Sequence, residues 1–373
     1  MELINRFKFF FTFFRIFGMC YQTPGMSRKV KILLITNGLI QFIIVLTLIP
    51  VAYLISLPSA GNEIMNYVQG ACILLVHLAS ILESLLTMER QLNFWRFIKR
   101  LEDIFEDNFE EIQIEYGKLK KSTIKIFWGF VIISFVTELG LASYLFFLNR
   151  TGTALKMSLI QWAIYVVSVL AGRIRYVEHT FTVELLTLFI KIFNKNVRSL
   201  KTHLITLKKD QAVDEFNRIK LAHTFIWETS RSINMCHQWT QFLNVLLSAF
   251  QITSLCYWTY FYTYLNQFIS LWPTGLCFIP LTYGISVLAS SCDVLQSEAL
   301  KSSSLLQEII KVNRNQISGF IQNCIANLTL QMYHEKIVMS VGKIFTINHG
   351  LLAKMVVAIS TYFVILIQFL EKK

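Results

Sequence analysis

The chain has 373 residues, of which 54% are hydrophobic, 14% aromatic and only 16% charged, with a net charge of +12. Soluble domains carry about 25% charged residues, so this composition excludes a disordered chain and a typical cytosolic enzyme. The basic residues flank apolar stretches, as membrane topology requires, and so indicate no nucleic-acid partner. We expect an all-α polytopic membrane protein.

The N-terminal segment is apolar but too short to cross a bilayer. Its run FFFTFF covers residues 9–14, and Arg6, Lys8 and Arg15 interrupt any signal-peptide core. We therefore expect an aromatic segment that lies at the cytoplasmic face of the membrane.

Seven apolar windows follow, each near the length of about 20 residues that a spanning helix needs. Short links alternate with long charged ones, and no Gly-rich or Pro-rich linker divides the chain. We expect one seven-helix domain over residues 1–373, with spans near 32–57, 65–88, 124–148, 157–180, 239–264, 272–292 and 346–370.

Lys and Arg are distributed unevenly between the two sides of these spans. Thirty of the 35 lie before the first span or in and around the long links. The positive-inside rule then predicts a cytoplasmic N-terminus, cytoplasmic long links and an extracellular C-terminus. The sequon at Asn149 falls in a predicted outer link, which fits this orientation and makes Asn149 a glycosylation candidate.

A G-protein-coupled receptor is one alternative, because it also has seven helices. Its N-terminus lies outside, however, and it commonly carries a disulfide to an outer loop. None of the seven cysteines lies in the three short links, and none forms a CxxC pair that would suggest a zinc or redox site.

The long links have helical periodicity of their own. Apolar residues recur at helical spacing within 92–116, 213–235 and 297–341, with charges between them. We expect helices that continue below the membrane and pack into a cytoplasmic anchor bundle, with the assembly interface there.

Charged groups inside the spans make a secondary transporter the second alternative, because transporters use such groups to carry protons. Glu83 and Glu138 lie in the second and third spans, and His77 lies near Glu83. Such groups could relay protons, or they could pair with Arg173, Arg175 or the backbone. We favour pairing. The motifs HExxH, GxSxG and GxGxxG are absent, so we expect no enzyme, no catalytic residue, no metal site and no cofactor.

Aromatic residues gather in the predicted outer halves of the middle spans. Trp and Tyr prefer the membrane interface anywhere, which explains part of this pattern. The functional interpretation is an outward-facing pocket between spans two to six that binds a small molecule. The candidates are Tyr67, Tyr144, Gln161, Trp162, Tyr165, Tyr257, Trp258 and Phe278.

The last span carries polar groups at intervals of seven residues, on one face of a helix. These are Lys354, Thr361 and Gln368. One such helix cannot enclose a pore, but several copies around an axis could, with Gln368 and Phe369 as a constriction. Interhelical hydrogen bonding is the other interpretation of the stripe, and Lys354 could reach the cytoplasmic interface instead.

Residues 342–369 resemble the C-terminal signature of insect gustatory receptors. The signature has a Gly, then Phe345, Ile347 and Asn348, and closes with Thr361-Tyr362, five apolar residues and Gln368-Phe369. Many relatives carry Asp where this chain has Asn348. Outside the last span the resemblance is one of topology.

The resemblance implies a tetrameric, ligand-gated, nonselective cation channel whose last helix lines the pore. It assigns Thr361, Tyr362, Gln368 and Phe369 to the pore and gate. We therefore expect a taste receptor in the plasma membrane of a sensory neuron, in contact with the lipid bilayer, that forms a homotetramer or a heterotetramer with related receptors. Bitter compounds, sugars and other tastants all fit an aromatic pocket, so the sequence does not name the ligand.

Overall fold

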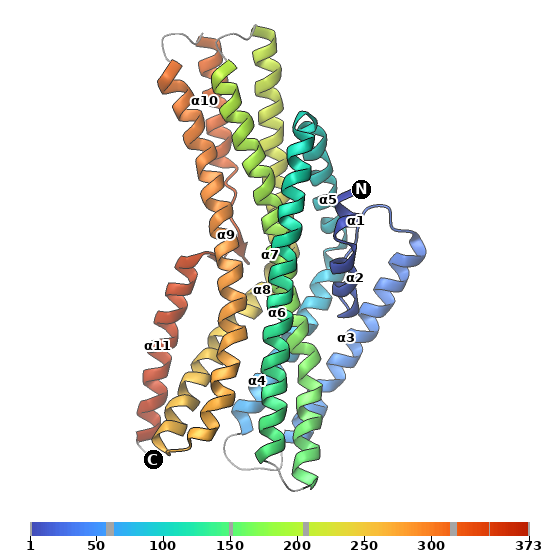
Figure 1. Cartoon of the computed structure of the whole chain (residues 1–373), viewed down its shortest axis with the longest axis vertical. Coiled ribbons are helices and arrows are strands. Elements are labelled where there is room, and N and C mark those ends of the chain that lie inside the picture. Colours follow the sequence, from blue (N-terminus) through green and yellow to red (C-terminus); the bar gives the residue numbers. More distant parts are fainter. Residues whose placement is uncertain are drawn as a thin grey trace.

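Long helices make up most of the molecule (Figure 1). The computed structural model describes residues 2–56, 63–148, 152–203, 209–313, 319–342 and 344–371. Each expected span overlaps one of its long helices. These are α3 (Arg28–Ser56), α4 (Glu63–Leu86), α6 (Phe109–Leu148), α7 (Gly152–His203), α8 (Lys209–Tyr264), α9 (Leu271–Asn313) and α11 (His349–Glu371).

Several of these helices are suited to a membrane by length and composition. Within the described residues, four stretches qualify, in α3, α6, α8 and α9. A fifth qualifies if α4 and the following α5 (Met88–Ile104), which meet at a bend of 64°, count together, and 349–365 is a shorter apolar helix. The protein is therefore an all-α membrane protein with several membrane-capable helices.

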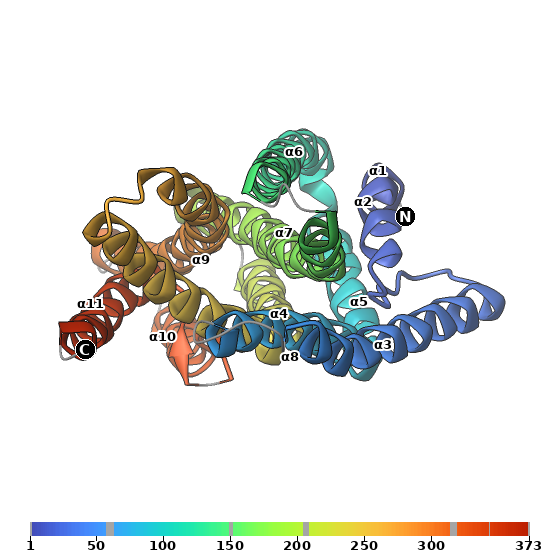
Figure 2. The ribbon, with the colours of Figure 1, turned by 90° about the horizontal axis from the view of Figure 1, so that it is seen from below.

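Helix α7 lies at the centre of the bundle. It packs against α4, α6, α8 and α9, and the view along the helices shows it surrounded by them (Figure 2). Helix α11 lies at one edge, where it packs against α8 and α9, and α3 lies at the opposite side. This arrangement leaves much of α11 without a neighbour in the described chain.

The N-terminal segment packs against the rest of the bundle. It forms α1 (Glu2–Arg6) and α2 (Lys8–Ile16), and Phe7, Phe11 and Phe14 are each at most 2% exposed. The ring centroid of Phe7 lies 4.8 Å from that of Phe181 on α7. Four phenylalanines share one face of α2 and its start, so packing that face against the bundle buries their apolar surface.

The expected helical extensions are present and form an anchor bundle, which we define as the end of α7, the start of α8, the end of α9 and α10 (Gly319–His334). In this bundle His223 Nδ1 lies 3.2 Å from Glu335 Oε2. Burial lowers the pKa of His223, although the neighbouring carboxylate acts to raise it.

Two details differ from the expected helical pattern. Residues 92–116 do not form one helix, because α5 ends at Ile104 and a single 3-10 turn (Glu106–Asn108) precedes α6. The segment 297–341 ends in a short hairpin of β1 (Ser340–Val341) and β2 (Phe345–Thr346), in which Gly342 has a φ of 55°. Glycine adopts this left-handed conformation without the steric cost that other residues bear.

Candidate functional site

A cavity of about 300 Å³, here called the inner cavity, lies among α4, α6, α7, α8 and α9. These are the helices that contain spans two to six. Most of its wall is apolar, as in typical small-molecule sites. The lining comprises Ile73, Val76, Glu138, Leu141, Trp162, Tyr165, Val166, Ser168, Val169, Gly172, Arg173, Tyr176, Asn244, Leu247, Ser248, Gln251, Leu255, Cys277, Pro280 and Leu281.

Helix α8 supplies a row of polar side chains to this wall. Asn244, Ser248 and Gln251 recur four and three residues apart, so they share one face of the helix. Asn244 and Ser248 are each only 4% exposed. The Ser248 hydroxyl lies 3.4 Å from the hydroxyl of Tyr176 on α7, which ties the two helices together across the cavity wall.

Two donors on the wall have no hydrogen-bond partner among the described residues. They are Nδ2 of Asn244 and Nη1 of Arg173. A buried donor without a partner costs about 1–3 kcal/mol. A molecule in the inner cavity with a hydroxyl, ether or carbonyl oxygen could accept from them and recover part of that cost.

A charged pair forms one side of the inner cavity. Arg173 Nη1 lies 3.3 Å from Glu138 Oε1, which is an ion-pair distance without the geometry of a hydrogen bond. Trp162 Nε1 donates to the other carboxylate oxygen of Glu138 at 3.1 Å. The expected pairing of Glu138 with an arginine is therefore confirmed.

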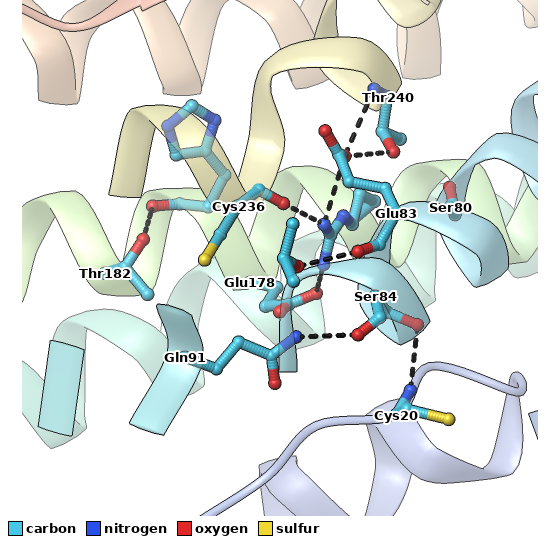
Figure 3. A network of polar contacts seen from close by, with 12 residues as sticks. Cys20, Ser80, Glu83, Ser84, Gln91, Glu178, Thr182, Cys236 and Thr240 are labelled. Carbon is cyan, nitrogen blue, oxygen red and sulfur yellow. Dashed lines mark hydrogen bonds and ion pairs between the residues drawn. The ribbon is translucent and has the colours of Figure 1, made fainter. Parts of the chain in front are cut away.

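A second charged cluster lies deeper in the bundle, where α4, α7 and α8 meet. Arg175 donates to Glu178 Oε2 at 2.5 Å, to Glu83 Oε2 at 3.3 Å and to the Cys236 carbonyl at 2.6 Å. Figure 3 shows Glu83, Glu178 and Cys236 converging on one point. Arg175 is fully buried, and pairing satisfies most of its donors. The expected pairing of Glu83 is likewise confirmed, and a proton-relay role is no longer needed to explain a carboxylate inside the span.

The aromatic candidates occupy several different environments. Trp162 and Tyr165 line the inner cavity, while Tyr144 donates to Ser270 Oγ at 3.1 Å. Tyr257 and Trp258 pack edge to face against each other on α8, with ring centroids 5.5 Å apart, and neither lines the inner cavity.

Phe278 is half-buried beside Cys277 without lining the inner cavity. The side chains of Tyr67 and Gln161, and the sequon residue Asn149, lie outside the described residues.

The pore candidates lie on the exposed side of α11. Thr361 and Gln368 are exposed, Tyr362 is 63% exposed, and Lys354 is exposed nearer the start of the helix. The side chain of Phe369 lies outside the described residues. Within the described residues, the chain therefore presents the polar stripe of α11 outward and does not bury it against another helix.

Sequence reasoning missed Asn244, Ser248 and Gln251 as cavity residues. A signal was present, because these polar residues recur at helical spacing inside an otherwise apolar window. The search for aromatic residues passed over them. Gly172 also lines the inner cavity, and its sequence context does not reveal this. A Cβ at Gly172 would lie 3.6 Å from Oδ1 of Asn244, so α7 and α8 approach each other closely at this point.

Comparisons with known protein families and with individual proteins both point to insect chemosensory receptors. Residues 7–372 match the protein family described as 7tm Chemosensory receptor. A curated protein of Drosophila melanogaster, "Putative gustatory receptor 2a", is 21% identical over 354 residues, covering 84% of this chain and 79% of that protein.

Solved structures with a similar fold include the insect olfactory receptor OR5 from Machilis hrabei. It matches over 99% of both chains with a TM-score of 0.74 and 13% identity. The same receptor in complex with eugenol matches over 99% of both chains with a TM-score of 0.67 and 13% identity. At this identity the two structures show a shared fold and carry no information on the ligand of this chain.

Proposed function

The chain belongs to the 7tm chemosensory receptor family, and on that premise we propose that it is a gustatory receptor acting as a ligand-gated, nonselective cation channel. A small-molecule tastant binds in the inner cavity and favours the open state because it binds that state more tightly. The conformational change reaches α11, and cations pass through a pore that copies of α11 enclose.

The inner cavity is the observation that supports ligand binding most directly. It has the mixed character of small-molecule sites, with apolar walls and a few polar groups that can orient a ligand. Nδ2 of Asn244 has no hydrogen-bond partner among the described residues, and Nη1 of Arg173 has only its ion pair with Glu138, so both can donate to a ligand that contains a hydrogen-bond acceptor.

The exposed stripe on α11 supports the pore. Thr361 and Gln368 face away from the helices against which α11 packs, so in an assembly of four chains they could line a shared axis. We propose a homotetramer, or a heterotetramer with related receptors, in the plasma membrane of a sensory neuron. The N-terminus and the anchor bundle are then cytoplasmic and the C-terminus extracellular.

The proposal is tested by expressing this chain alone in cells without other chemosensory receptors. A panel of sugars, bitter compounds and other tastants is applied, and calcium entry is read first, followed by patch-clamp current. We expect at least one compound to evoke a saturating response with unitary conductance. A saturating flux without unitary events would indicate a transporter, and an N-terminal tag accessible on intact cells would contradict the proposed orientation.

A variant of the inner cavity tests where the active compound binds. Asn244→Leu removes a donor to the ligand, so we expect the half-maximal concentration to rise about fivefold, as the loss of about 1 kcal/mol predicts. The matched control is Asn323→Leu, because Asn323 is exposed on α10 and far from the cavity. Equal responses of the wild type and Asn244→Leu would argue against this binding site.

A further inference from the structure

A second cavity, here called the lateral groove, lies beside the inner cavity. It has a volume of about 360 Å³ and runs between α2, α6 and α7. Among its lining residues, Phe135 and Leu139 on α6 are 67% and 55% exposed. Helices α2 and α6 lie on one outer side of the bundle with the central α7 behind them (Figure 2), so at this depth the lateral groove faces the hydrocarbon of the bilayer.

The lining of the lateral groove is almost entirely apolar. Phenylalanines from α2 and α6 form its inner end, and aliphatic side chains of α6 and α7 form its length. Among the lining side chains only Ser134, Glu138, Trp162 and Arg173 carry polar atoms. An uncharged apolar molecule dissolved in the membrane would enter this groove without losing hydration, whereas a sugar or an ion would not reach it.

A thin wall separates the lateral groove from the inner cavity. The two cavities share four lining residues, Glu138, Trp162, Val166 and Arg173. The hydrogen bond from Trp162 Nε1 to Glu138 and the ion pair of Arg173 with Glu138 close this wall. The same side chains therefore face the membrane on one side and the proposed ligand site on the other.

We propose that the lateral groove is the entry route for the ligand, that Trp162 is the movable part of the wall, and that the ligands are uncharged, membrane-partitioning molecules with a hydrogen-bonding oxygen. This inference rests on the proposed binding of a ligand in the inner cavity. It narrows the ligand class to lipophilic compounds and excludes sugars.

The wall can open at low cost because only one of its two interactions has to break. When the indole of Trp162 rotates away, Glu138 loses one neutral donor but keeps Arg173 as its ionic partner. No buried charge is left unpaired, which would cost several kcal/mol. A hydroxyl on the entering ligand can donate to Glu138 in place of the indole, and its oxygen can accept from Arg173 Nη1.

A native cysteine allows this route to be tested without knowledge of the ligand. Cys277 lines the inner cavity but not the lateral groove. The purified full-length receptor in lipid vesicles is exposed to N-phenylmaleimide, which is uncharged and partitions into bilayers, or to a sulfonated maleimide that stays in water. Labelling of Cys277 is followed by mass spectrometry of its peptide. Cys256 is half-buried on α8 and lines neither cavity, so it serves as the internal reference.

Substitutions of Ala142 and Trp162 should change the labelling rate of Cys277 in opposite directions. Ala142 lines only the lateral groove, one helical turn from Glu138, so Ala142→Trp fills the groove beside the wall. We expect it to slow the labelling of Cys277 by N-phenylmaleimide about tenfold, the factor that an added barrier of about 1.4 kcal/mol produces. Trp162→Ala should accelerate labelling. Ala163→Trp, at an exposed alanine that lines neither cavity, should leave the rate unchanged.

Three results would overturn the entry route. The first is equal labelling rates in Ala142→Trp and the wild type, as expected if a bound lipid permanently fills the groove or another path exists. The second is labelling by the sulfonated reagent as fast as by N-phenylmaleimide, which would mean entry from water. The third is equal slowing in Ala142→Trp and Ala163→Trp. Labelling requires neither agonist nor current. The labelling experiment can therefore contradict the entry route while the recordings support channel function, and the recordings can contradict channel function while labelling supports the entry route.

Discussion

Individual residues show how this fold tolerates charge inside an apolar bundle. Arg175 has two carboxylates and a backbone carbonyl as partners, and it is completely buried. The second oxygen of Glu83 accepts from the backbone N–H of Trp239 at 2.7 Å, so the cluster joins α4, α7 and α8. Each charge of the cluster therefore has an opposite charge beside it, and the stability of the cluster depends on every member being present.

Removal of Arg175 should consequently be severe. Arg175→Ala leaves Glu83 and Glu178 buried without their cation, and breaking such a pair costs about 3–5 kcal/mol. We expect little monodisperse receptor in fluorescence-detected size-exclusion chromatography and a lower melting temperature for what remains. Arg198→Ala, at an exposed arginine of the same helix, is the control. A normal yield and melting temperature for Arg175→Ala would show that the cluster contributes little to stability.

Among the elements, α11 depends most on how its first turn is held. The Oδ1 of Asn348 accepts from the backbone N–H of Leu351 at 3.0 Å, and Oδ2 of Asp293 on α9 accepts from the N–H of His349 at 3.0 Å. These bonds satisfy donors that the start of a helix otherwise leaves free. The hairpin before α11 is held in turn by Asn234 of α8, which donates to the Val338 carbonyl at 2.8 Å. The proposed pore helix is therefore attached to α8 and α9 at its base.

Loss of this cap should weaken the connection between ligand binding and the pore. Asn348→Ala removes a cap worth about 1 kcal/mol, so the first turn of α11 frays and transmits movement of α9 less well. We expect a reduced maximal current at an unchanged half-maximal concentration. Asn348→Asp retains an acceptor and should behave like the wild type, and Asn323→Ala controls for the substitution itself. A rise in half-maximal concentration with full maximal current would assign Asn348 to binding instead.

At the scale of the whole molecule, the exposed side of α11 supports the proposal that several chains assemble around a pore. Leu351 and Met355 are buried against the bundle, whereas Val356, Val357, Tyr362 and Val364 are each more than 50% exposed. Apolar groups can face lipid at no cost, but the polar groups among them are better satisfied in a water-filled passage. We propose that other copies of the chain provide that passage.

Gln368 should then influence the ions that pass. Gln368→Ala removes a ring of amide groups from the constriction, so we expect an altered permeability ratio of Ca²⁺ to Na⁺ at normal surface expression. Gln267→Ala is the matched control, since Gln267 is an exposed glutamine in the link between α8 and α9. Reversal potentials under bi-ionic conditions provide the measurement. A ratio identical to that of the wild type would remove Gln368 from the conduction path.

Local patterns in the sequence were sufficient for the long helices and the family, but not for the break after α5 or the hairpin of β1 and β2. Long apolar windows indicate helices regardless of their neighbours, and each of the seven windows overlaps a helix of the structure. Helical periodicity in the long links predicts extensions in the same way, and the ending Thr361-Tyr362 with Gln368-Phe369 is a linear motif. Electrostatics favoured pairing of Glu83 and Glu138 over a proton relay, because an unpaired carboxylate in an apolar bundle is costly, and the structure shows both pairs.

Only the tertiary structure decided which side chains meet. A cavity is formed by residues from several helices, and small differences in the rotation of each helix determine which of its faces lines the cavity. Trp162 and Tyr165 therefore line the inner cavity while Tyr257, Trp258 and Phe278 do not, although all five are aromatic and lie in the spans. The packing of α2 against α6 and α7 is also invisible in the sequence, and it is this contact between distant segments that creates the lateral groove.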